Sequence, residues 1–376
     1  MRYLYRPAGS RSSSPRRHHP SRHPIHTPAS EDLETSIPVI RFPADLVSRL
    51  RSFYEGRSVC VTGGAGFIGG HLVDTLHSLG ATVSVIDDLS SSTLDHLGEL
   101  LAMEPERIRF VQGSILDDDA LRDAVRGSTV VFHLAAIGSV PRSIEDPERT
   151  WQVNATGTLR VLQSARAHGV ERVVFAASSS AYGDAPTLPK VETQVPAPRS
   201  PYAASKLAGE HLVSAWSHSY GLSGVSLRYF NVFGPRQPAD SAYAAVVPSF
   251  AKRLIAGEAP TLYGDGSASR DFTYVANAVL ATLLAGSARL RTSGEVVNVG
   301  TGRRVTVLEL AQMIAERCGN VDLSPVRLPA RAGDVQHSLA SLDRAKELIG
   351  YSPVISLEEG LTETVAWYNG AASRLG

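Results

Sequence analysis

A tyrosine and a lysine four residues apart are the residues of this sequence best suited to catalysis. Tyr202 and Lys206 lie in the segment SPYAASKLAGEHL, which predicts a helix, and a spacing of one turn places both side chains on the same face. A free tyrosine has a pKa of about 10, so it acts as a base at neutral pH only beside cations. We expect the Lys206 ammonium to lower the pKa of Tyr202 and to favour its phenolate form.

Three consecutive serines follow the end of a predicted strand. Ser178, Ser179 and Ser180 stand in FAASSSAYG, and Ser178 precedes Tyr202 by 24 residues. If the strand belongs to a parallel sheet, the serine hydroxyls reach its carboxyl edge, where such sheets bind their ligands. A serine cluster alone is more often a hydrogen-bonded turn, so its functional interpretation depends on the other motifs.

A glycine-rich turn predicts a dinucleotide site. VTGGAGFIGGHLVDTL follows a strand and opens a helix, with Gly63, Gly66 and Gly69 spaced as GxxGxxG. Glycine permits the tight turn and the approach of a pyrophosphate, to which the helix N-terminus offers free N–H groups. Asp87 ends the next strand, where an acid binds the adenosine ribose, and residues 81–93 hold no Arg or Lys for a 2′-phosphate. We therefore predict NAD rather than NADP, and its oxidised ring is a second cation for the tyrosine.

The order of strands and helices predicts an α/β fold. The short β-branched runs are SVCVTG, TVSVID, IRFVQG, TVVFHLA and RVVFAA, with helical stretches between most of them. This alternation is typical of a Rossmann-type, doubly wound parallel sheet with helices on both faces. Further helices are predicted over Ala44–Tyr54, Val246–Ala256, Thr306–Cys318 and Leu342–Leu348.

The chain divides into four parts in this interpretation. Residues 1–36 predict a disordered basic tail, because they are rich in Ser, Pro, Arg and His and have little apolar surface to bury. Residues 37–57 form a helix and lead-in, and residues 58–230 an NAD-binding domain. Residues 231–376 form a smaller C-terminal α/β region for the substrate, from which some strands return to the main sheet.

The composition excludes several classes of protein. Basic and acidic residues both total 37, but six arginines lie in the first 30 residues, so the rest of the chain is mildly acidic and gives no support for nucleic-acid binding. No apolar run is long enough for a membrane span. The only cysteines, Cys60 and Cys318, lie far apart, which argues against disulfides and a metal site. We expect a cytoplasmic protein.

The motifs together resemble those of the extended short-chain dehydrogenase/reductase family. TGGAGFIG, HLAA, SSSAYG, YxxxK, RYFNVFGP and SRDFTYV occur in the family's order and spacing from about Val59 to Tyr351. Within the family, GSVPRSIEDP, SPYAASK and SAYAAVVPSF look closest to UDP-N-acetylglucosamine 4-epimerases. The resemblance implies an NAD-dependent isomerase that interconverts C4 epimers of UDP-sugars. It also implies a homodimer formed by helices near Glu148–His168 and Tyr202–Tyr220.

The resemblance assigns roles to matching positions. Ser178 would bind the sugar 4-hydroxyl, Tyr202 would be the base, and Lys206 would bind the nicotinamide ribose, with Asn154 positioning Lys206. Residues His133–Ala136 would line the NAD cleft. The full cofactor set is Gly63, Gly66, Phe67, Ile68, Gly69, Asp87, Ser114, Ile115, Leu134, Ala135, Ala136, Asn154, Tyr202 and Lys206. The substrate set is Gly138, Ser139, Val140, Ser178, Ser179, Ser180, Asn231, Ala245, Val246, Arg270, Arg331, Asp334 and Ser338.

The choice of substrate depends on Ser338 in this interpretation. In similar 4-epimerases restricted to plain glucose and galactose, that place holds a tyrosine beside the sugar C2, whereas a serine leaves room for an acetamido group. A sugar 4,6-dehydratase would carry Thr–Asp–Glu where this chain has three serines. A UDP-glucuronate 4-epimerase or decarboxylase remains an alternative, and a non-catalytic NAD-binding regulator usually loses the Tyr–Lys pair. Asn277, where many members carry aspartate, is predicted to be structural.

Overall fold

The computed structural model describes residues 42–95, 97–239, 245–290, 294–329 and 335–375. The predicted N-terminal tail lies outside these residues. The described residues all belong to one compact unit of the chain.

The core of the described chain is a parallel sheet of seven strands in the order β11-β6-β5-β4-β1-β2-β3. All five strands predicted from the first half are confirmed, and two more complete the sheet. The strands are β1 (Ser58–Thr62), β2 (Thr82–Asp87), β3 (Ile108–Gln112), β4 (Val130–His133), β5 (Arg172–Ser178), β6 (Ser223–Tyr229) and β11 (Glu295–Val299). Every neighbouring pair is parallel. This order confirms the Rossmann-type fold.

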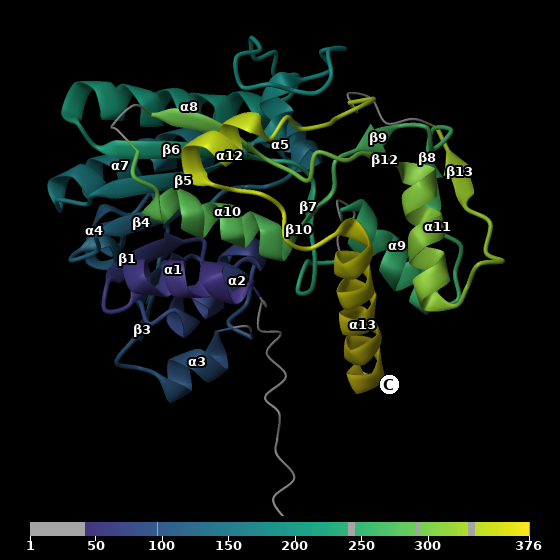
Figure 1. Cartoon of the computed structure of the whole chain (residues 1–376), viewed down its shortest axis with the longest axis horizontal. Helices are drawn as coiled ribbons and strands as arrows, with labels where there is room; N and C mark the ends of the chain where they lie inside the picture. The colour runs from purple at the N-terminus through teal and green to yellow at the C-terminus, as the bar shows by residue number, and fades with distance from the viewer. Residues whose placement is uncertain (1–41, 96, 240–244, 291–293, 330–334, 376) are drawn as a thin grey trace, which may run out of the picture. The chain divides into compact units, whose positions relative to one another are not determined.

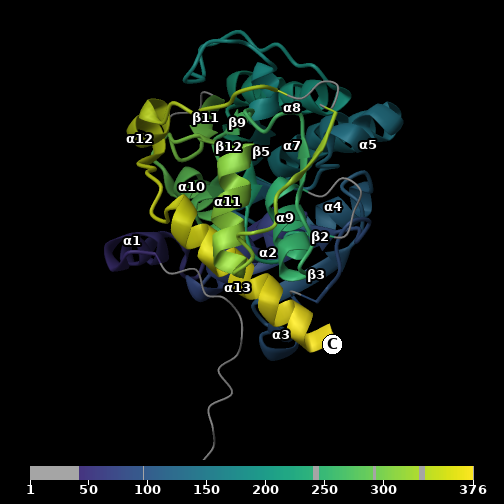
Figure 2. The same ribbon diagram turned by 90° about the vertical axis from the view of Figure 1, so that its right-hand side faces the viewer.

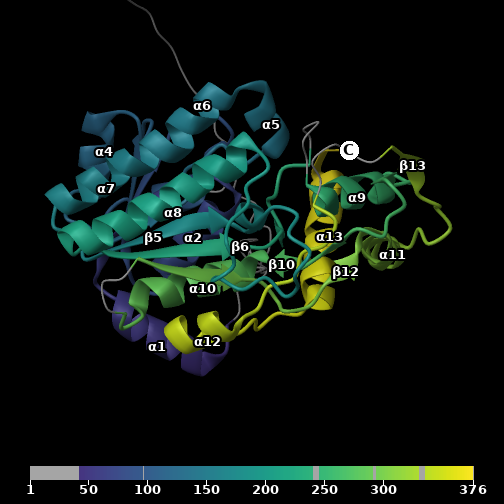
Figure 3. The ribbon, with the colours of Figure 1, turned by 90° about the horizontal axis from the view of Figure 1, so that it is seen from above.

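Helices cover both faces of the sheet (Figures 1 and 3). On one face lie α4 (Asp118–Val125), α7 (Gly157–Ala167) and α8 (Pro201–Tyr220). On the other lie α1 (Ala44–Tyr54), α2 (Phe67–Ser78) and α10 (Val275–Ser287). The predicted bounds of α1 are confirmed. Helix α10 is buried along almost its whole length, which fits a helix that is apolar on all sides.

The two faces of the sheet have separate apolar clusters. Successive side chains of a strand point to opposite faces, so Val59 and Val61 join the larger cluster and Cys60 the smaller one. The larger cluster also contains α10 and continues into the C-terminal region. Both faces of the sheet are therefore covered by apolar side chains, which leaves the ends of the strands for the loops that form a site.

The C-terminal region is built from helices and short strand pairs. Helices α9 (Val246–Ile255), α11 (Val307–Cys318) and α13 (Leu357–Leu375) pack beside one another, as Figure 2 shows. Helix α12 (Asp343–Ile349) packs against β11, and the helices predicted here are confirmed within two residues. The strand pairs are β7 (Val232–Phe233) with β10 (Thr273–Tyr274), β8 (Thr261–Tyr263) with β13 (Val326–Leu328), and β9 (Ser269–Arg270) with β12 (Val305–Thr306).

The remaining short elements lie near the carboxyl edge of the sheet or at its margin. They are α3 (Gly98–Met103), α5 (Val140–Glu145), α6 (Pro147–Trp151), a π-helical turn (Gln152–Thr156) and a 3-10 turn (Ser179–Tyr182). The predicted helix near Glu148–His168 is therefore three consecutive segments, α6, the π turn and α7. In the described ranges, no helix has the length and apolarity that crossing a membrane requires.

Asn277 on α10 has the structural role that the sequence predicts. Its amide donates to Ile355 O at 2.7 Å, and its side-chain oxygen accepts from Val354 N at 2.8 Å and Ile355 N at 3.1 Å. The side chain is fully buried. It joins the segment before α13 to the buried helix α10, and it does not line the cavity described below.

Candidate active site

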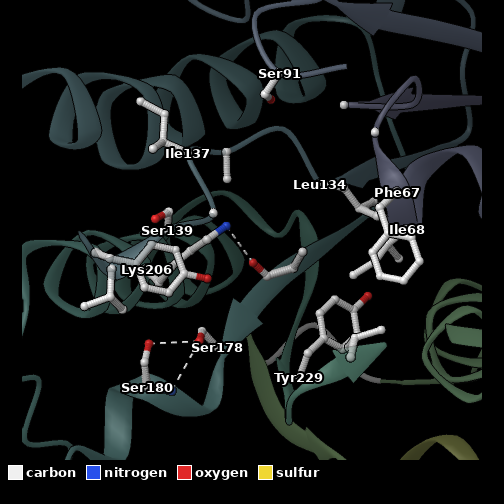
Figure 4. A pocket seen from close by; sticks show the side chains of 18 of the residues that line it. Phe67, Ile68, Ser91, Leu134, Ile137, Ser139, Ser178, Ser180, Lys206 and Tyr229 are labelled. Atoms are coloured by element: carbon white, nitrogen blue, oxygen red, sulfur yellow. Dashed lines mark hydrogen bonds between the residues drawn. The ribbon is translucent and has the colours of Figure 1, made fainter. Parts of the chain in front are cut away.

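The site lies where the sheet order reverses. The chain runs from β1 outward through β2 and β3, then returns to β4 on the other side of β1, which opens a crevice at the carboxyl ends of these strands. A cavity of about 1310 Å³ occupies this place and extends into the C-terminal region. In Figure 4, Phe67, Ile68 and Leu134 lie on one side of it, and Ser139, Ser178, Ser180 and Lys206 on the other.

The glycine turn between β1 and α2 has the geometry that the sequence predicts. Gly63 has a φ of +71°, a left-handed conformation that favours glycine. A Cβ on Gly69 would lie 2.1 Å from Gly63 O, so only glycine lets α2 begin so close to the turn. Gly63, Gly66 and Gly69 all line the cavity. A side-chain-free cradle at a helix N-terminus fits the pyrophosphate of a dinucleotide.

Asp87 ends β2 beside this turn. One carboxylate oxygen accepts from Ala65 N at 3.1 Å, and the other accepts from Leu89 N at 2.9 Å and Ser92 Oγ at 3.1 Å. Asp87 lines the cavity, and the lone pair left on its carboxylate can accept from a ribose hydroxyl. The carboxylate therefore holds the glycine turn in place as well as facing a ligand.

The other cofactor residues divide into those that line the cavity and those beneath it. Ser114, Ile115, Leu134, Ala135 and Ala136 line it. His133 does not, which corrects the prediction for this residue. It is buried between Thr62 Oγ1 at 2.8 Å and Thr158 Oγ1 at 2.9 Å, and burial lowers the pKa of its ring to about 3. A neutral imidazole here joins β1, β4 and α7 below the cavity.

The three candidate catalytic residues come from two elements that pack together. Ser178 is the last residue of β5, and Tyr202 and Lys206 lie one turn apart on α8; all three line the cavity. Ser178 Oγ accepts from Ser180 Oγ at 2.8 Å and is hydrogen-bonded to the Tyr202 side chain. Lys206 Nζ donates to Ala176 O at 2.9 Å. The constellation predicted from sequence is thus brought to one place.

The electrostatics of the pair differ from the sequence prediction. Burial raises the pKa of Tyr202, and the hydrogen bond from Ser178 opposes this rise. Burial also lowers the pKa of Lys206 to about 7. We expected the lysine to lower the pKa of the tyrosine, but desolvation dominates both groups. The protein therefore holds Tyr202 protonated unless a bound ligand adds positive charge beside it.

Asn154 lies in the π-helical turn before α7. Its side-chain oxygen accepts from Ile137 N at 2.8 Å, and its amide donates to Ile137 O at 3.2 Å and Ser205 Oγ at 3.0 Å. These bonds tie the loop after β4 to the residue before Lys206. Asn154 is buried and does not itself line the cavity, which corrects its place in the cofactor set. It is linked to the turn that carries Lys206 through Ser205. The π turn supplies the bulge that points this amide inward.

Most predicted substrate residues line the same cavity. These are Gly138, Ser139, Val140, Ser178, Ser179, Ser180, Asn231, Ala245, Arg270 and Ser338. Val246 does not: it begins α9 and packs against the larger apolar cluster, which corrects its assignment. Arg331 and Asp334 lie outside the described residues. Arg270 donates to Ser269 O at 3.0 Å and Gln336 O at 2.9 Å, so its guanidinium is oriented beside the cavity.

Several cavity residues were not predicted. They include Asp88, Ser90, Ser91, Ser92, Gly113, Ile137, Arg142, Arg149, Tyr182, Lys190, Tyr229, Phe230, Gln237 and Pro238. Tyr182 stands in the SSSAYG motif and Gln237 is the second residue after RYFNVFGP, so motif context indicates them. Nothing in the sequence around Lys190 distinguishes it from a surface lysine. No group of three metal-ligating side chains occurs in the part of the chain that the structure describes.

The fold and the site together define an enzyme that binds a dinucleotide and carries a Ser–Tyr–Lys constellation. The sequence matches the NAD dependent epimerase/dehydratase family over residues 59–300. A UDP-glucose 4-epimerase of Mycolicibacterium smegmatis is 39% identical over 310 residues, covering 82% of this chain and 97% of that protein. A dTDP-glucose 4,6-dehydratase of Streptomyces niveus is 36% identical, covering 82% and 92%.

A solved structure is similar throughout the same region. The UDP-N-acetylglucosamine 4-epimerase from Methanobrevibacter ruminantium, in complex with UDP-N-acetylmuramic acid, has a TM-score of 0.79 and 37% identity. The match covers 84% of this chain and 99% of that one. The chain belongs to the NAD-dependent epimerase/dehydratase family, and it is an NAD-dependent isomerase.

Proposed function

We propose that the enzyme interconverts UDP-N-acetylglucosamine and UDP-N-acetylgalactosamine at C4, and also accepts UDP-glucose and UDP-galactose. The observation that carries this proposal is the place of Ser338. It is only 8% exposed and lines the cavity that also contains Ser178 and Tyr202. Its hydroxyl accepts from Asn231 Nδ2 at 3.4 Å. A small polar side chain there leaves volume and a hydrogen-bonding group for an acetamido substituent.

The proposed chemistry begins with proton removal from the sugar 4-hydroxyl. Ser178 orients that hydroxyl, and Tyr202 accepts its proton. The glycine turn, Asp87 and Lys206 would hold NAD, which would supply the hydride acceptor for C4 and, after the 4-keto sugar has turned within the cavity, the hydride donor to its opposite face. The positive nicotinamide ring would also supply the charge that Tyr202 needs, because burial raises the pKa of this tyrosine. Lys206 can protonate or deprotonate near neutral pH, since burial brings its pKa to about 7.

Three other functions are less well supported. A 4,6-dehydratase needs an acid and a base at C5–C6, but the turn after β5 offers the hydroxyls of Ser179 and Ser180 instead of carboxyl groups. A UDP-glucuronate 4-epimerase or decarboxylase needs recognition of a carboxylate. Lys190 and Arg142 are cations on the cavity wall, but Lys190 Nζ already donates to Ala185 O. A non-catalytic regulator would not require the preserved contact between Ser178 and Tyr202.

One experiment separates these functions. The purified enzyme is incubated with a panel of UDP-sugars without added reductant or NAD, and products are identified by NMR. We expect C4 epimers of the N-acetylated sugars to form fastest. Net formation of a 4-keto-6-deoxy sugar, loss of CO₂, or no turnover of any sugar would each contradict the proposal.

We also propose a homodimer formed through α8 and the segment from α6 to α7. On α8, Ala204, Leu207, Ala208 and Leu212 are partly exposed and Ala215 is exposed, whereas Ala203 faces the sheet and is buried. Nearby, Ile144 and Trp151 are 63% and 49% exposed. So much exposed apolar surface on adjoining helices favours a self-complementary contact. Light scattering at micromolar concentration should give twice the chain mass, and a monomer alone would contradict this.

A further inference from the structure

A buried polar network beneath the cavity connects three parts of the site that are distant in sequence. Its members are Glu210 on α8, Arg228 on β6, Tyr182 at the end of the serine turn and Asn298 on β11, here called the floor network. None of the four is more than 3% exposed. Buried polar groups are costly unless they are bonded, so the bonds among these four residues restrict how the elements that carry them can be arranged. Of their side-chain nitrogen and oxygen atoms, Nη1 of Arg228 alone lacks a hydrogen-bond partner in the described structure.

The first link joins the catalytic helix to the sheet. Glu210 lies one turn beyond Lys206 and two beyond Tyr202, on the same face of α8. Its carboxylate accepts from Arg228 Nε at 2.9 Å and from Arg228 Nη2 at 2.7 Å. A bidentate pair of this kind fixes direction as well as distance. The rotation of α8, and with it the direction of the Tyr202 side chain, is thereby tied to β6.

The second link joins the arginine to the serine turn. The Arg228 guanidinium carbon lies 4.5 Å from the centre of the Tyr182 ring, and the two side chains are also hydrogen-bonded. Tyr182 ends the 3-10 turn that begins at Ser179, directly after Ser178. It lines the cavity as well. The guanidinium therefore contacts both elements that carry the candidate catalytic residues.

The third link reaches the substrate region. Tyr182 Oη donates to Asn298 Oδ1 at 2.7 Å, and Asn298 Nδ2 donates to Lys190 O at 2.9 Å and Ser341 O at 3.3 Å. Ser341 lies three residues after Ser338, and the backbone of Lys190 donates to Leu339 O at 2.7 Å. The amide of Asn298 thus holds the segment that presents Ser338 to the cavity.

We propose that the floor network positions the base and the sugar-binding segment relative to each other, and that Glu210, Arg228, Tyr182 and Asn298 are positioning residues of the reaction. The Tyr182 hydroxyl connects the catalytic elements to the substrate segment through its bond to Asn298. Because this inference takes a UDP-sugar as substrate, it rests on the proposed function. The two links act mainly on different steps but are coupled, because Arg228 contacts Tyr182. The Tyr182–Asn298 bond mostly affects binding of the sugar nucleotide, and the Glu210–Arg228 pair mostly affects the chemical step.

The test uses four variants of the full chain: Tyr182→Phe, Glu210→Gln, the double variant, and Tyr54→Phe. Tyr54→Phe is a matched control, because Tyr54 Oη also donates in the core, to Leu283 O at 2.6 Å, and Tyr54 does not line the cavity. All four are first checked for NAD content and melting temperature. Kinetics are then measured over pH 6–9.

We expect Tyr182→Phe to raise KM about tenfold with a smaller change in kcat, the size expected for one buried hydrogen bond. Glu210→Gln should lower kcat by about ten- to hundredfold and move the pH profile, because small displacements of a base are costly. In the double variant, the loss of kcat/KM should be smaller than the product of the two single losses, because both substitutions break the same network. Tyr54→Phe should lower only the melting temperature.

Two results would overturn the proposal. In the first, Tyr182→Phe and Glu210→Gln lower the melting temperature but leave kcat, KM and the pH profile unchanged, as the control does. In the second, the loss of kcat/KM in the double variant equals the full product of the two single losses. If the wild type turns over no UDP-sugar, the proposed function fails, and calorimetry with UDP then tests the network: Tyr182→Phe should bind UDP about tenfold more weakly, and equal affinity would contradict it.

Discussion

The two ends of the cavity are built by different means. Around the cofactor residues, the lining consists of backbone turns at the ends of β1, β2 and β4, and the glycines at positions 63 and 69 are required by close contacts. Around the substrate residues, the lining consists of irregular segments held by side chains. The carboxylate of Asp271 alone accepts from Thr301 N and Oγ1, Gly302 N and Ala340 N, at 2.7–3.2 Å.

This difference has a consequence for specificity. A turn made of backbone has one shape that sequence changes elsewhere hardly alter, which suits a cofactor common to a family. A segment held by a few side-chain bonds can be repositioned by single substitutions, which suits a region that distinguishes substrates. Helix α8 lies between the two and carries the catalytic pair. Five predictions test this division, beginning with the largest expected effect.

Tyr202→Phe removes the proposed base, which α8 carries between the cofactor end and the substrate end of the cavity. The hydroxyl is hydrogen-bonded to Ser178, and the ring remains to fill the space. We expect kcat to fall by about 10²–10⁴, the contribution typical of a general base, with NAD content and melting temperature unchanged. Steady-state kinetics with the best UDP-sugar measure this. Activity at the wild-type level would show that another group takes the proton.

Lys206→Met should inactivate the enzyme and yet stabilise its NAD-free form. Burial lowers the pKa of Lys206 from 10.5 to about 7. Between these values the unfolded chain binds a proton that the folded chain does not, so folding stability rises with pH across this window. The variant removes this penalty, which reaches up to about 4 kcal/mol at pH 7, at about 1.4 kcal/mol per pKa unit.

Urea unfolding at pH 7 and pH 10 measures this gain. The difference between Lys206→Met and wild type should be larger at pH 7 than at pH 10. Lys346→Met is the matched control, because Lys346 is exposed on α12. A variant that is less stable than wild type at both pH values would mean that the bond to Ala176 O outweighs the cost of burial.

Sequence reasoning succeeds at the cofactor end for a physical reason. The strand, the turn and the helix that bind NAD are contiguous, so Gly63, Gly69 and Asp87 are recognised from local spacing alone. The catalytic pair is similarly local, since one helical turn joins Tyr202 to Lys206. The fold follows from alternating β-branched runs and amphipathic stretches, which also require only local information.

The rest of the site depends on contacts between residues that are distant in sequence, which spacing along the chain does not reveal. Glu210 and Arg228 appear as ordinary surface charges until the fold buries them together. Lys190 reaches the cavity only because its strand-like segment pairs with Ala340. For Tyr202 the sequence predicts a pKa lowered by Lys206 and NAD together, whereas burial raises it in the protein without NAD, because desolvation depends on packing. The combined effect with NAD stays a prediction. His133 and Val246 were misplaced because a motif shows proximity to a site without showing which way a side chain points.

Gly69→Ala should damage the cofactor end selectively. An added Cβ would lie 2.1 Å from Gly63 O, so the turn and the start of α2 must separate. We expect loss of bound NAD and about 1–3 kcal/mol of stability, the usual cost of overpacking. Gly98→Ala is the control, since nothing lies within 4 Å of a Cβ there. NAD content after purification is decisive: a variant that keeps stoichiometric NAD would show that the close approach is dispensable.

Ser338→Tyr should alter the substrate end without affecting the cofactor. The larger ring would fill the space that we assign to the acetamido group, so kcat/KM for the N-acetylated sugar should fall by about 10²-fold while that for UDP-glucose changes little. Ser338→Ala keeps the space and removes only the hydroxyl, and it should retain the N-acetyl substrate. Competition kinetics with both sugars measure the ratio. An unchanged ratio in Ser338→Tyr would place the acetamido group elsewhere.

Asn277→Asp should lower the stability of the fold and leave activity unchanged, which is the smallest effect on activity among these variants. The substitution keeps the acceptors for Val354 N and Ile355 N but loses the amide that donates to Ile355 O. A protonated aspartate can donate in its place, whereas a buried carboxylate facing a carbonyl is unfavourable, so the pKa of the new group must be raised. A raised pKa means that stability falls as pH increases through it. We therefore expect a loss of about 1–3 kcal/mol at pH 8 and less at pH 5, with kcat and KM unchanged. A change in KM at full NAD content would show that α10 transmits strain to the segment that binds the substrate. The cofactor end and the substrate end of the cavity would then not be independent of each other.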